Sequence, residues 1–208
     1  MAPTRPSIVG LSTGPEPPYP LRMEGKVIKG FGRGAKELGF PTANLPVDGN
    51  LTPWIVNIKS GVYLGWVSLC PVPSSHANQP TTLSETGATT MTSDATQASS
   101  RKFSIYPMVM SIGYNKFYKN KERSAEVHVL HEFVTTFYGA EMRLLITGFI
   151  REEKDYPTRE ALIEDIAMDC EVARKSLDRE AWALRETGKG TLDGSWLTRE
   201  TPEQSGAV

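Results

Sequence analysis

Short apolar runs separated by glycine, asparagine or other polar residues dominate the chain, and this pattern limits its fold more than any other feature. In the run 61–69, Val62, Leu64 and Trp66 alternate with residues of the opposite face. Alternation with a period of two predicts β-strands. The runs of this kind are residues 23–29, 61–69, 106–112, 126–130 and 143–150. The regular alternation of strands and helices that a doubly wound sheet requires is missing.

One helix is predicted, and it comes late in the chain. Pro157 and Thr158 provide a start signal in which Thr158 is the expected N-cap. Apolar residues then recur every three or four positions at Leu162, Ile166, Cys170, Ala173 and Leu177. Five or six short strands and one helix predict a mainly β protein, a small closed or half-closed antiparallel barrel with the helix packed outside.

Composition divides the chain into an ordered domain and three polar or proline-rich segments. Residues 1–20 contain six prolines and are predicted to be a disordered tail. The barrel domain is expected over residues 21–185, interrupted at 71–102 by a low-complexity insertion. Residues 71–100 hold six serines and seven threonines, and such a segment buries too little apolar area to order itself. Residues 186–208 are expected to be a polar C-terminal tail.

The bulk numbers exclude several classes of protein. A formal net charge of −1 and a pI near 6.3 argue against a general nucleic-acid binder, which carries a basic excess. Cys70 and Cys170 are too few and too far apart for a disulfide scaffold or a thiolate zinc cluster. No apolar run approaches the ~18 residues of a membrane span. We therefore expect a cytoplasmic protein that does not bind membranes, with a mitochondrial pool left open.

The glycine-rich stretch Gly30-Phe-Gly-Arg-Gly-Ala-Lys36 is a candidate anion-binding loop. Glycine tolerates positive φ, so successive main-chain amides can approach and point at one oxyanion. Lys36 adds a positive charge. The equally weighted alternative is a plain turn between two barrel strands, and the spacing is not that of a P-loop.

The stretch Gly39-Phe-Pro-Thr-Ala-Asn44 places two small polar residues two positions apart. If the prolines keep the backbone extended, Thr42 and Asn44 face the same side. A hydroxyl and an amide carbonyl are hard oxygen ligands that suit Mg²⁺. Taken alone, the stretch fits better with the alternative that both side chains cap a turn through local hydrogen bonds.

Glu126 and the segment after the last strand are the remaining candidates. Glu126 lies within an apolar run, where a carboxylate most often belongs to a solvated outer face; His128 shares its face. Aromatic and charged residues alternate around 137–139 and 151–156. They could enclose a flat heterocycle, although an ion-paired loop at the edge of the core explains them as well.

Four separated blocks, taken together and in order, resemble riboflavin kinases. The blocks read GKVIKGFGRGAKELGFPTANLP, SGVYLGWVSL, MVMSIGYNKFYKNKERSAEVHVLHEF and FYGAEMRLLITGFIREEKDY. The resemblance covers roughly residues 22–180 apart from the insertion. It implies a six-stranded antiparallel Greek-key barrel with a C-terminal helix. It also implies transfer of the γ-phosphate of ATP to riboflavin, giving FMN and ADP.

The resemblance also implies roles for individual residues. Glu126 matches the catalytic residue of the family, and Thr42 and Asn44 match its metal ligands, with Mg²⁺ as the expected ion and Zn²⁺ or Mn²⁺ as possible substitutes. The residues that match the ATP side are Gly30, Lys36, Thr42, Val129, His131 and Tyr138. The residues that match the flavin side are Arg151, Lys154 and Tyr156.

Riboflavin and ATP are thus the expected partners of a monomer that binds no nucleic acid. Two other functions stay open at this point. One is a nucleic-acid-binding barrel of the OB type, since small barrels host that function. The other is a flavin-binding protein without catalytic activity.

Overall fold

The computed structural model describes residues 5–29, 38–70, 103–114, 123–134 and 136–200. The elements in chain order are β1 (Leu21–Lys26), β2 (Ala43–Leu45), the 3-10 turn η1 (Pro53–Val56), β3 (Gly61–Cys70), β4 (Ser104–Tyr114), β5 (Arg123–Val129), β6 (Glu141–Glu152), α1 (Arg159–Leu177), η3 (Arg185–Thr187) and α2 (Ser195–Thr198). The predicted mainly β fold with one long helix is confirmed.

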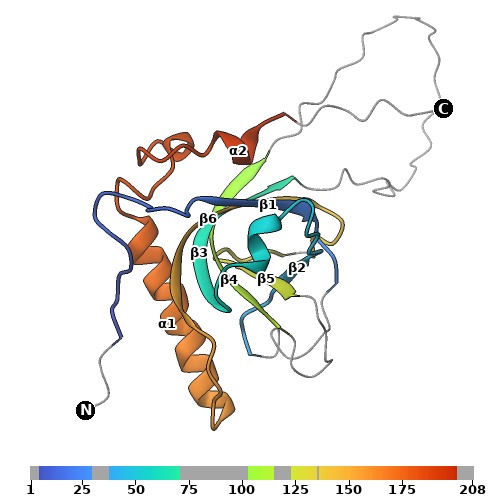
Figure 1. Ribbon diagram of the computed structural model, residues 1–208, viewed down its shortest axis with the longest axis vertical. Coiled ribbons are helices and arrows are strands. Elements are labelled where there is room, and N and C mark those ends of the chain that lie inside the picture. The colour runs from blue at the N-terminus through green and yellow to red at the C-terminus, as the bar shows by residue number, and fades with distance from the viewer. Residues whose placement is uncertain (1–4, 30–37, 71–102, 115–122, 135, 201–208) are drawn as a thin grey trace, which may run out of the picture.

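The six strands form one antiparallel sheet in the order β1-β6-β3-β4-β5-β2. Strands β3, β4 and β5 follow one another, and β6 returns to lie beside β3, which is the Greek-key arrangement. The sheet curls into a half-barrel (Figure 1). Its two edges meet where the N–H of Ile28 donates to the carbonyl of Asn44 at 2.9 Å. This bridge brings the end of the first strand beside the PTAN segment.

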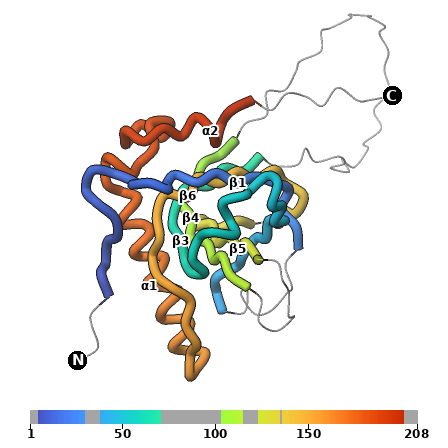
Figure 2. Tube along the Cα trace, in the orientation of Figure 1, coloured from blue at the N-terminus to red at the C-terminus, as the bar shows by residue number. Residues whose placement is uncertain are grey.

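The sheet has an apolar core on each face. Alternate residues of β4, Met108, Met110 and Ile112, point into the barrel. Val109 lies on the outer face, in a second cluster that α1 covers. The tube view shows α1 running alongside the barrel (Figure 2). Strand alternation therefore decides which side chains are enclosed in the barrel and which face the helix.

Helix α1 begins where its start signal predicts. The side chain of Thr158 accepts a hydrogen bond from the N–H of Ala161 at 3.1 Å, which makes Thr158 the N-cap. The predicted apolar face is also confirmed, because Cys170, Ala173 and Leu177 are buried against the sheet.

The prediction of a disordered tail over residues 1–20 is wrong for residues 5–20, which form an ordered strap along α1 (Figure 1). The guanidinium of Arg179 donates to the carbonyls of Gly10 at 3.1 Å and Leu11 at 3.0 Å. The indole N–H of Trp182 also donates to Leu11, at 2.8 Å. Prolines disfavour strand or helix structure in this strap. Its main-chain carbonyls nevertheless accept hydrogen bonds from the Arg179 and Trp182 side chains, and these bonds hold the strap in place.

Residues 186–200, which the sequence predicts to be part of a polar C-terminal tail, are packed against the barrel. Leu197 of α2 is fully buried, and its carbonyl accepts a hydrogen bond from Ser68 at 2.7 Å. Arg143, itself buried, lies 3.5 Å from Glu24 and donates to the carbonyl of Arg199. One apolar side chain and a few main-chain acceptors thus anchor a segment whose composition is mostly polar.

Two other expectations lie outside the described residues, namely the disordered insertion at 71–102 and the conformation of the 30–36 loop. Among the helices that the structure describes, none has the length and apolar character needed to cross a bilayer.

Candidate active site

Contacts with the side chain of His128 hold the PTAN segment against β5. Gly39 has a φ of +85°, a left-handed conformation that turns the chain toward β2. The ring nitrogen Nδ1 of His128 lies 2.8 Å from the carbonyl of Pro41 and, when protonated, donates to it. Phe40 contacts the His128 ring edge-on, with 5.6 Å between centroids. These contacts fix the position of the segment relative to β5 at the point where β2 begins.

Strand pairing places Asn44 directly opposite Glu126. In β2, Ala43 and Leu45 are buried in the barrel core, so alternation puts the side chain of Asn44 on the outer face. Asn44 pairs with Glu126 of β5, and Glu126 pairs in turn with Ser111 of β4. Directly opposite residues have Cβ atoms about 4.5–5.5 Å apart. Three polar side chains thus form a row across three adjacent strands, which we call the polar row (Asn44, Glu126, Ser111).

Thr42 and Asn44 carry the kinds of side-chain oxygen that Mg²⁺ binds in proteins. Thr42 immediately precedes β2 and is half-buried, while Asn44 is only 8% exposed. Their oxygens are neutral hard ligands, and Mg²⁺ is usually held by few protein oxygens together with water and substrate phosphates. No group of three or more His, Cys, Asp or Glu side chains in the described part of the chain could hold a metal by itself. Hence a metal at this row would depend on its substrate for part of its coordination.

Three of the predicted nucleotide-side residues, Val129, His131 and Tyr138, lie at and beyond the end of β5. The ring of His131 stacks on Tyr106 with 4.5 Å between centroids, and Phe133 contacts both rings edge-on. Tyr138 is half-exposed. Val129 is buried in the barrel core, so its side chain is not available to a nucleotide and any contact would come from its main chain. Gly30 and Lys36 lie outside the described residues.

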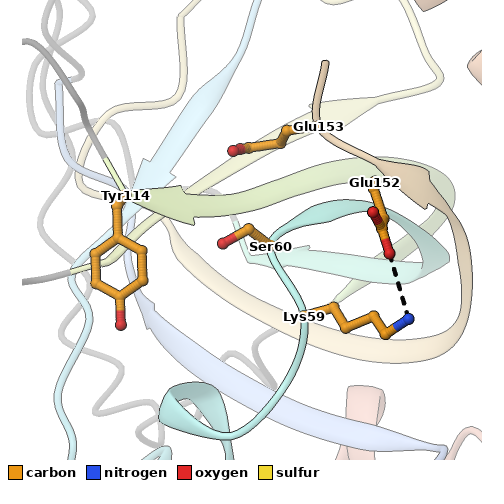
Figure 3. Close-up of a pocket in the computed structure, with 5 residues that line it drawn as sticks. All are labelled: Lys59, Ser60, Tyr114, Glu152 and Glu153. Atoms are coloured by element: carbon orange, nitrogen blue, oxygen red, sulfur yellow. Dashed lines mark hydrogen bonds and ion pairs between the residues drawn. The ribbon is translucent and has the colours of Figure 1, made fainter.

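An open pocket of about 430 Å³ lies where β3 begins and β4 and β6 end. Its lining residues are Lys59, Ser60, Tyr114, Glu152 and Glu153. Figure 3 shows Tyr114 across the opening from Glu152, whose carboxylate pairs with Lys59 at 3.3 Å. The pocket is close to the polar row, because Tyr114 pairs with Arg123, three residues before Glu126 on β5.

A glycine makes room for one carboxylate of this pocket. A Cβ on Gly113 would stand only 2.0 Å from Oε1 of Glu153, so any larger residue at this position would displace the Glu153 carboxylate. Gly113 is two residues from Ser111 along β4. The pocket and the polar row therefore share one end of the barrel.

The predicted flavin-side residues converge on two carboxylates of α1, Asp165 and Asp169. The guanidinium of Arg151 binds Asp169 through Nε, at 3.0 and 3.1 Å, and through Nη2, at 2.7 Å. Lys154 lies 3.1 Å from Asp165, and the hydroxyl of Tyr156 donates to the same carboxylate. We call these five residues the carboxylate cluster (Arg151, Lys154, Tyr156, Asp165, Asp169).

Burial and hydrogen bonding shift the pKa values in the carboxylate cluster. Burial raises the pKa of the Tyr156 hydroxyl, and its hydrogen bond to Asp165 raises it further, so Tyr156 stays a donor. Burial alone would raise the pKa of the Asp165 carboxyl. The hydrogen bonds from Tyr156 and Lys154, together with the charges of Arg151 and Arg5, outweigh that effect and lower this pKa.

The structure brings most of the sequence candidates into two groups. Thr42, Asn44 and Glu126 come together at β2 and β5, and the three flavin-side candidates come together at α1. Sequence reasoning missed Ser111, which strand alternation alone could have placed on the outer face with Val109. It also missed both aspartates and Arg5; the aspartates are one helical turn apart, a spacing that indicates a shared face but no partner.

Comparisons with known proteins agree on one family. A family model described as "Flavokinase: Riboflavin kinase" matches residues 17–177. The riboflavin kinase of Pyricularia oryzae is 54% identical over 99% of this chain and 100% of its own length, and that of Aspergillus fumigatus is 44% identical over 86% of each. The crystal structure of riboflavin kinase from Trypanosoma brucei has the same fold, with a TM-score of 0.60 at 24% identity over 89% of this chain and 91% of that one. The chain belongs to the riboflavin kinase family.

Proposed function

We propose that this protein transfers the γ-phosphate of ATP to the ribityl 5′-hydroxyl of riboflavin, giving FMN and ADP. The observation that carries the proposal is the pairing of Asn44 with Glu126 on adjacent strands, beside an open pocket. In this proposal Asn44 binds the metal that holds the phosphate, and Glu126 binds the acceptor hydroxyl. Their strand pairing brings the two groups within a few ångströms of each other, as phosphoryl transfer requires. Membership of the riboflavin kinase family identifies the two substrates.

Glu126 orients the attacking hydroxyl. Phosphoryl transfer passes through a loose transition state, so positioning and electrostatics provide most of the catalysis. A glutamate carboxylate is a weak base toward an alcohol, and it therefore accepts the proton late, as the oxygen bonds to phosphorus. The main-chain pairing of Glu126 on both sides, with β2 and β4, fixes its Cα opposite Asn44 and Ser111.

Thr42 and Asn44 are the proposed ligands of Mg²⁺. The ion, when bound with ATP, neutralises negative charge on the phosphate oxygens. The chain supplies the geometry: His128 fixes Pro41, the strand pairing fixes Asn44, and the Ile28 bridge closes the barrel beside them. Zn²⁺ or Mn²⁺ with the same oxygen ligands is the alternative.

The nucleotide and the flavin approach from different sides. The predicted phosphate donors are the amides of the 30–36 loop and Lys36, and the stacked pair of His131 and Tyr106 offers a flat aromatic surface for the base. Arg151, Lys154 and Tyr156 provide donors and a ring for the flavin. We infer a monomer that acts in the cytoplasm and has no role in nucleic-acid binding.

Formation of FMN tests the proposal. Purified protein is incubated with ATP, riboflavin and Mg²⁺, and flavins are separated by chromatography. We expect FMN and ADP in equal amounts and no FMN once Mg²⁺ is chelated. Quenching of riboflavin fluorescence without FMN formation would instead identify an inactive flavin-binding protein, and salt-sensitive RNA binding would favour the OB-type function.

A further inference from the structure

The N-terminal strap (residues 5–20) brings a charged side chain to the carboxylate cluster. The strap runs along α1, where the N–H of Val9 donates to the Ser176 hydroxyl at 3.0 Å. Arg179 and Trp182 hold the carbonyls that follow. These contacts fix the main chain near Arg5, whose guanidinium then reaches Asp165 and Asp169.

Arg5 and Arg151 bind the same buried carboxylate from two sides. Asp169 has a side chain only 2% exposed, and its Oδ1 accepts hydrogen bonds from both guanidinium groups. A second nitrogen of Arg5 lies 3.1 Å from Oδ1 of Asp165. A carboxylate offers about four acceptor positions, so the two arginines together with Tyr156 and Lys154 leave little acceptor capacity unused.

Arg5 also sets the charge balance of the cluster. Within these contacts, Arg5, Arg151 and Lys154 face two carboxylates, which leaves an excess of one positive charge. Without Arg5 the charges would cancel. Arg151 would then be drawn toward the acceptor positions that Arg5 vacates, away from its present orientation.

We propose that Arg5 is a positioning residue for flavin binding: by occupying Asp165 and Asp169, it holds Arg151 and Tyr156 in place and keeps the cluster cationic toward the polar edge of the flavin or the product phosphate. This inference rests on the proposed function, because it takes Arg151 and Tyr156 to face the flavin. Arg5 acts through Arg151 and contacts no substrate in this account.

Kinetics of Arg5→Ala and Arg5→Lys test the role. The alanine variant is expected to raise the KM for riboflavin and the Kd for FMN roughly 10- to 150-fold, the range for a lost hydrogen bond to a charged group. Its kcat and its KM for ATP should stay within about twofold, because loss of flavin affinity leaves the chemical step intact. The lysine variant keeps the charge and should recover part of the affinity. An equal rise in the KM values for riboflavin and ATP in Arg5→Ala would overturn the role. So would a flavin affinity in Arg5→Lys that is no higher than in Arg5→Ala.

A double variant separates positioning from general destabilisation. If Arg5 acts mainly through Arg151, Arg5→Ala raises the riboflavin KM by a smaller factor in an Arg151→Ala background than in the wild type. If the rise in riboflavin KM in the double variant equals the product of the rises in the two single variants, the proposal is wrong. Lys175→Ala is the matched control, because Lys175 pairs with Glu171 on an exposed part of α1, the helix that carries Asp165 and Asp169; it should behave as the wild type.

The binding of FMN is followed by flavin fluorescence in the same variants. Absence of FMN formation by the wild type would contradict the proposed function, whereas the FMN affinities of the variants would still decide the role of Arg5. Unchanged FMN affinity in Arg5→Ala, in an active enzyme, would contradict the role of Arg5 alone.

Discussion

The polar row and the carboxylate cluster are held in place by different means. Asn44, Glu126 and Ser111 are fixed by strand pairing, so their relative positions depend on main-chain hydrogen bonds. The cluster depends on side-chain ion pairs, and Arg5 and Asp169 are 164 residues apart in sequence. Strand register tolerates a changed side chain, whereas an ion-pair network rearranges when one member is lost. We therefore expect the row to govern the rate and the cluster to govern flavin affinity.

The largest effect is expected at the polar row. Glu126→Gln keeps the shape of the side chain but removes the carboxylate, and kcat should fall by ~10²–10⁴, the usual contribution of acid–base assistance. The KM values should change little, because strand pairing still holds the neighbouring ligands. Steady-state rates of FMN formation measure this, with Glu180→Gln, an exposed glutamate on the helix side, as the control. Near-normal turnover would remove Glu126 from the mechanism.

Asn44→Ala should raise the Mg²⁺ concentration at half-maximal rate by roughly 10- to 100-fold, the range observed when a metal site loses a supporting group. The reason is the loss of one of two proposed protein oxygens. Titration of the rate with Mg²⁺ measures the shift, and Asn57→Ala, an exposed asparagine after η1, is the control. An unchanged Mg²⁺ dependence would mean that Asn44 is only a structural residue of β2.

At the carboxylate cluster, stability should respond together with affinity. Asp169→Asn removes the more buried of the two carboxylates that Arg5 and Arg151 share, leaving Asp165 to pair with both arginines, and should lower the free energy of unfolding by ~2–3 kcal/mol. This is below the ~3–5 kcal/mol typical of a broken buried pair, because the two arginine side chains keep 21% and 15% exposure. Denaturant unfolding measures the loss. Asp178→Asn, at the exposed end of α1, should have little effect, and equal stability of both variants would contradict the account.

The smallest effect is expected at His128, and it depends on pH. Burial lowers the pKa of His128, its hydrogen bond to Pro41 raises it, and nearby Arg174 lowers it, with a net decrease. The unfolded chain then binds the proton more readily, so stability is full above pH ~6.5 and declines as the pH falls through the folded-state pKa.

His128→Asn retains a donor near Nδ1 and should flatten the pH dependence of unfolding in this window. His128→Ala should in addition lose about 1 kcal/mol with the hydrogen bond to Pro41. Thermal unfolding between pH 5 and 7.5 measures both variants. A steeper decline in His128→Asn than in the wild type would show that another group controls stability there.

The different construction of the two regions also explains what the sequence could predict. Alternation predicted five of the six strands but not β2, a proline and a threonine predicted the start of α1, and a two-residue spacing predicted that Thr42 and Asn44 face one side. These are local rules. The register that sets Asn44 opposite Glu126 depends on pairing between distant segments, and no local pattern contains it.

The strap shows the limit of composition as a guide to order. Six prolines in residues 1–20 argue for disorder, yet the docking of residues 5–20 depends on donors from Arg179 and Trp182, far away in the chain. The partners of Arg5 were likewise invisible, because an arginine in a proline-rich segment indicates no particular carboxylate. Long-range side-chain contacts are what the sequence alone left unpredicted.

The central claim is that the polar row governs the rate and the carboxylate cluster governs flavin affinity. The combined effect of one variant from each region tests this claim most directly. Values of kcat/KM for riboflavin are measured for Glu126→Gln, Arg151→Ala and the double variant, with single-turnover assays where rates are low. Independent regions predict that the two losses multiply, to within about twofold. A double variant no worse than the Glu126→Gln single variant would show that both residues serve one catalytic unit, and would contradict the separation of rate from flavin affinity.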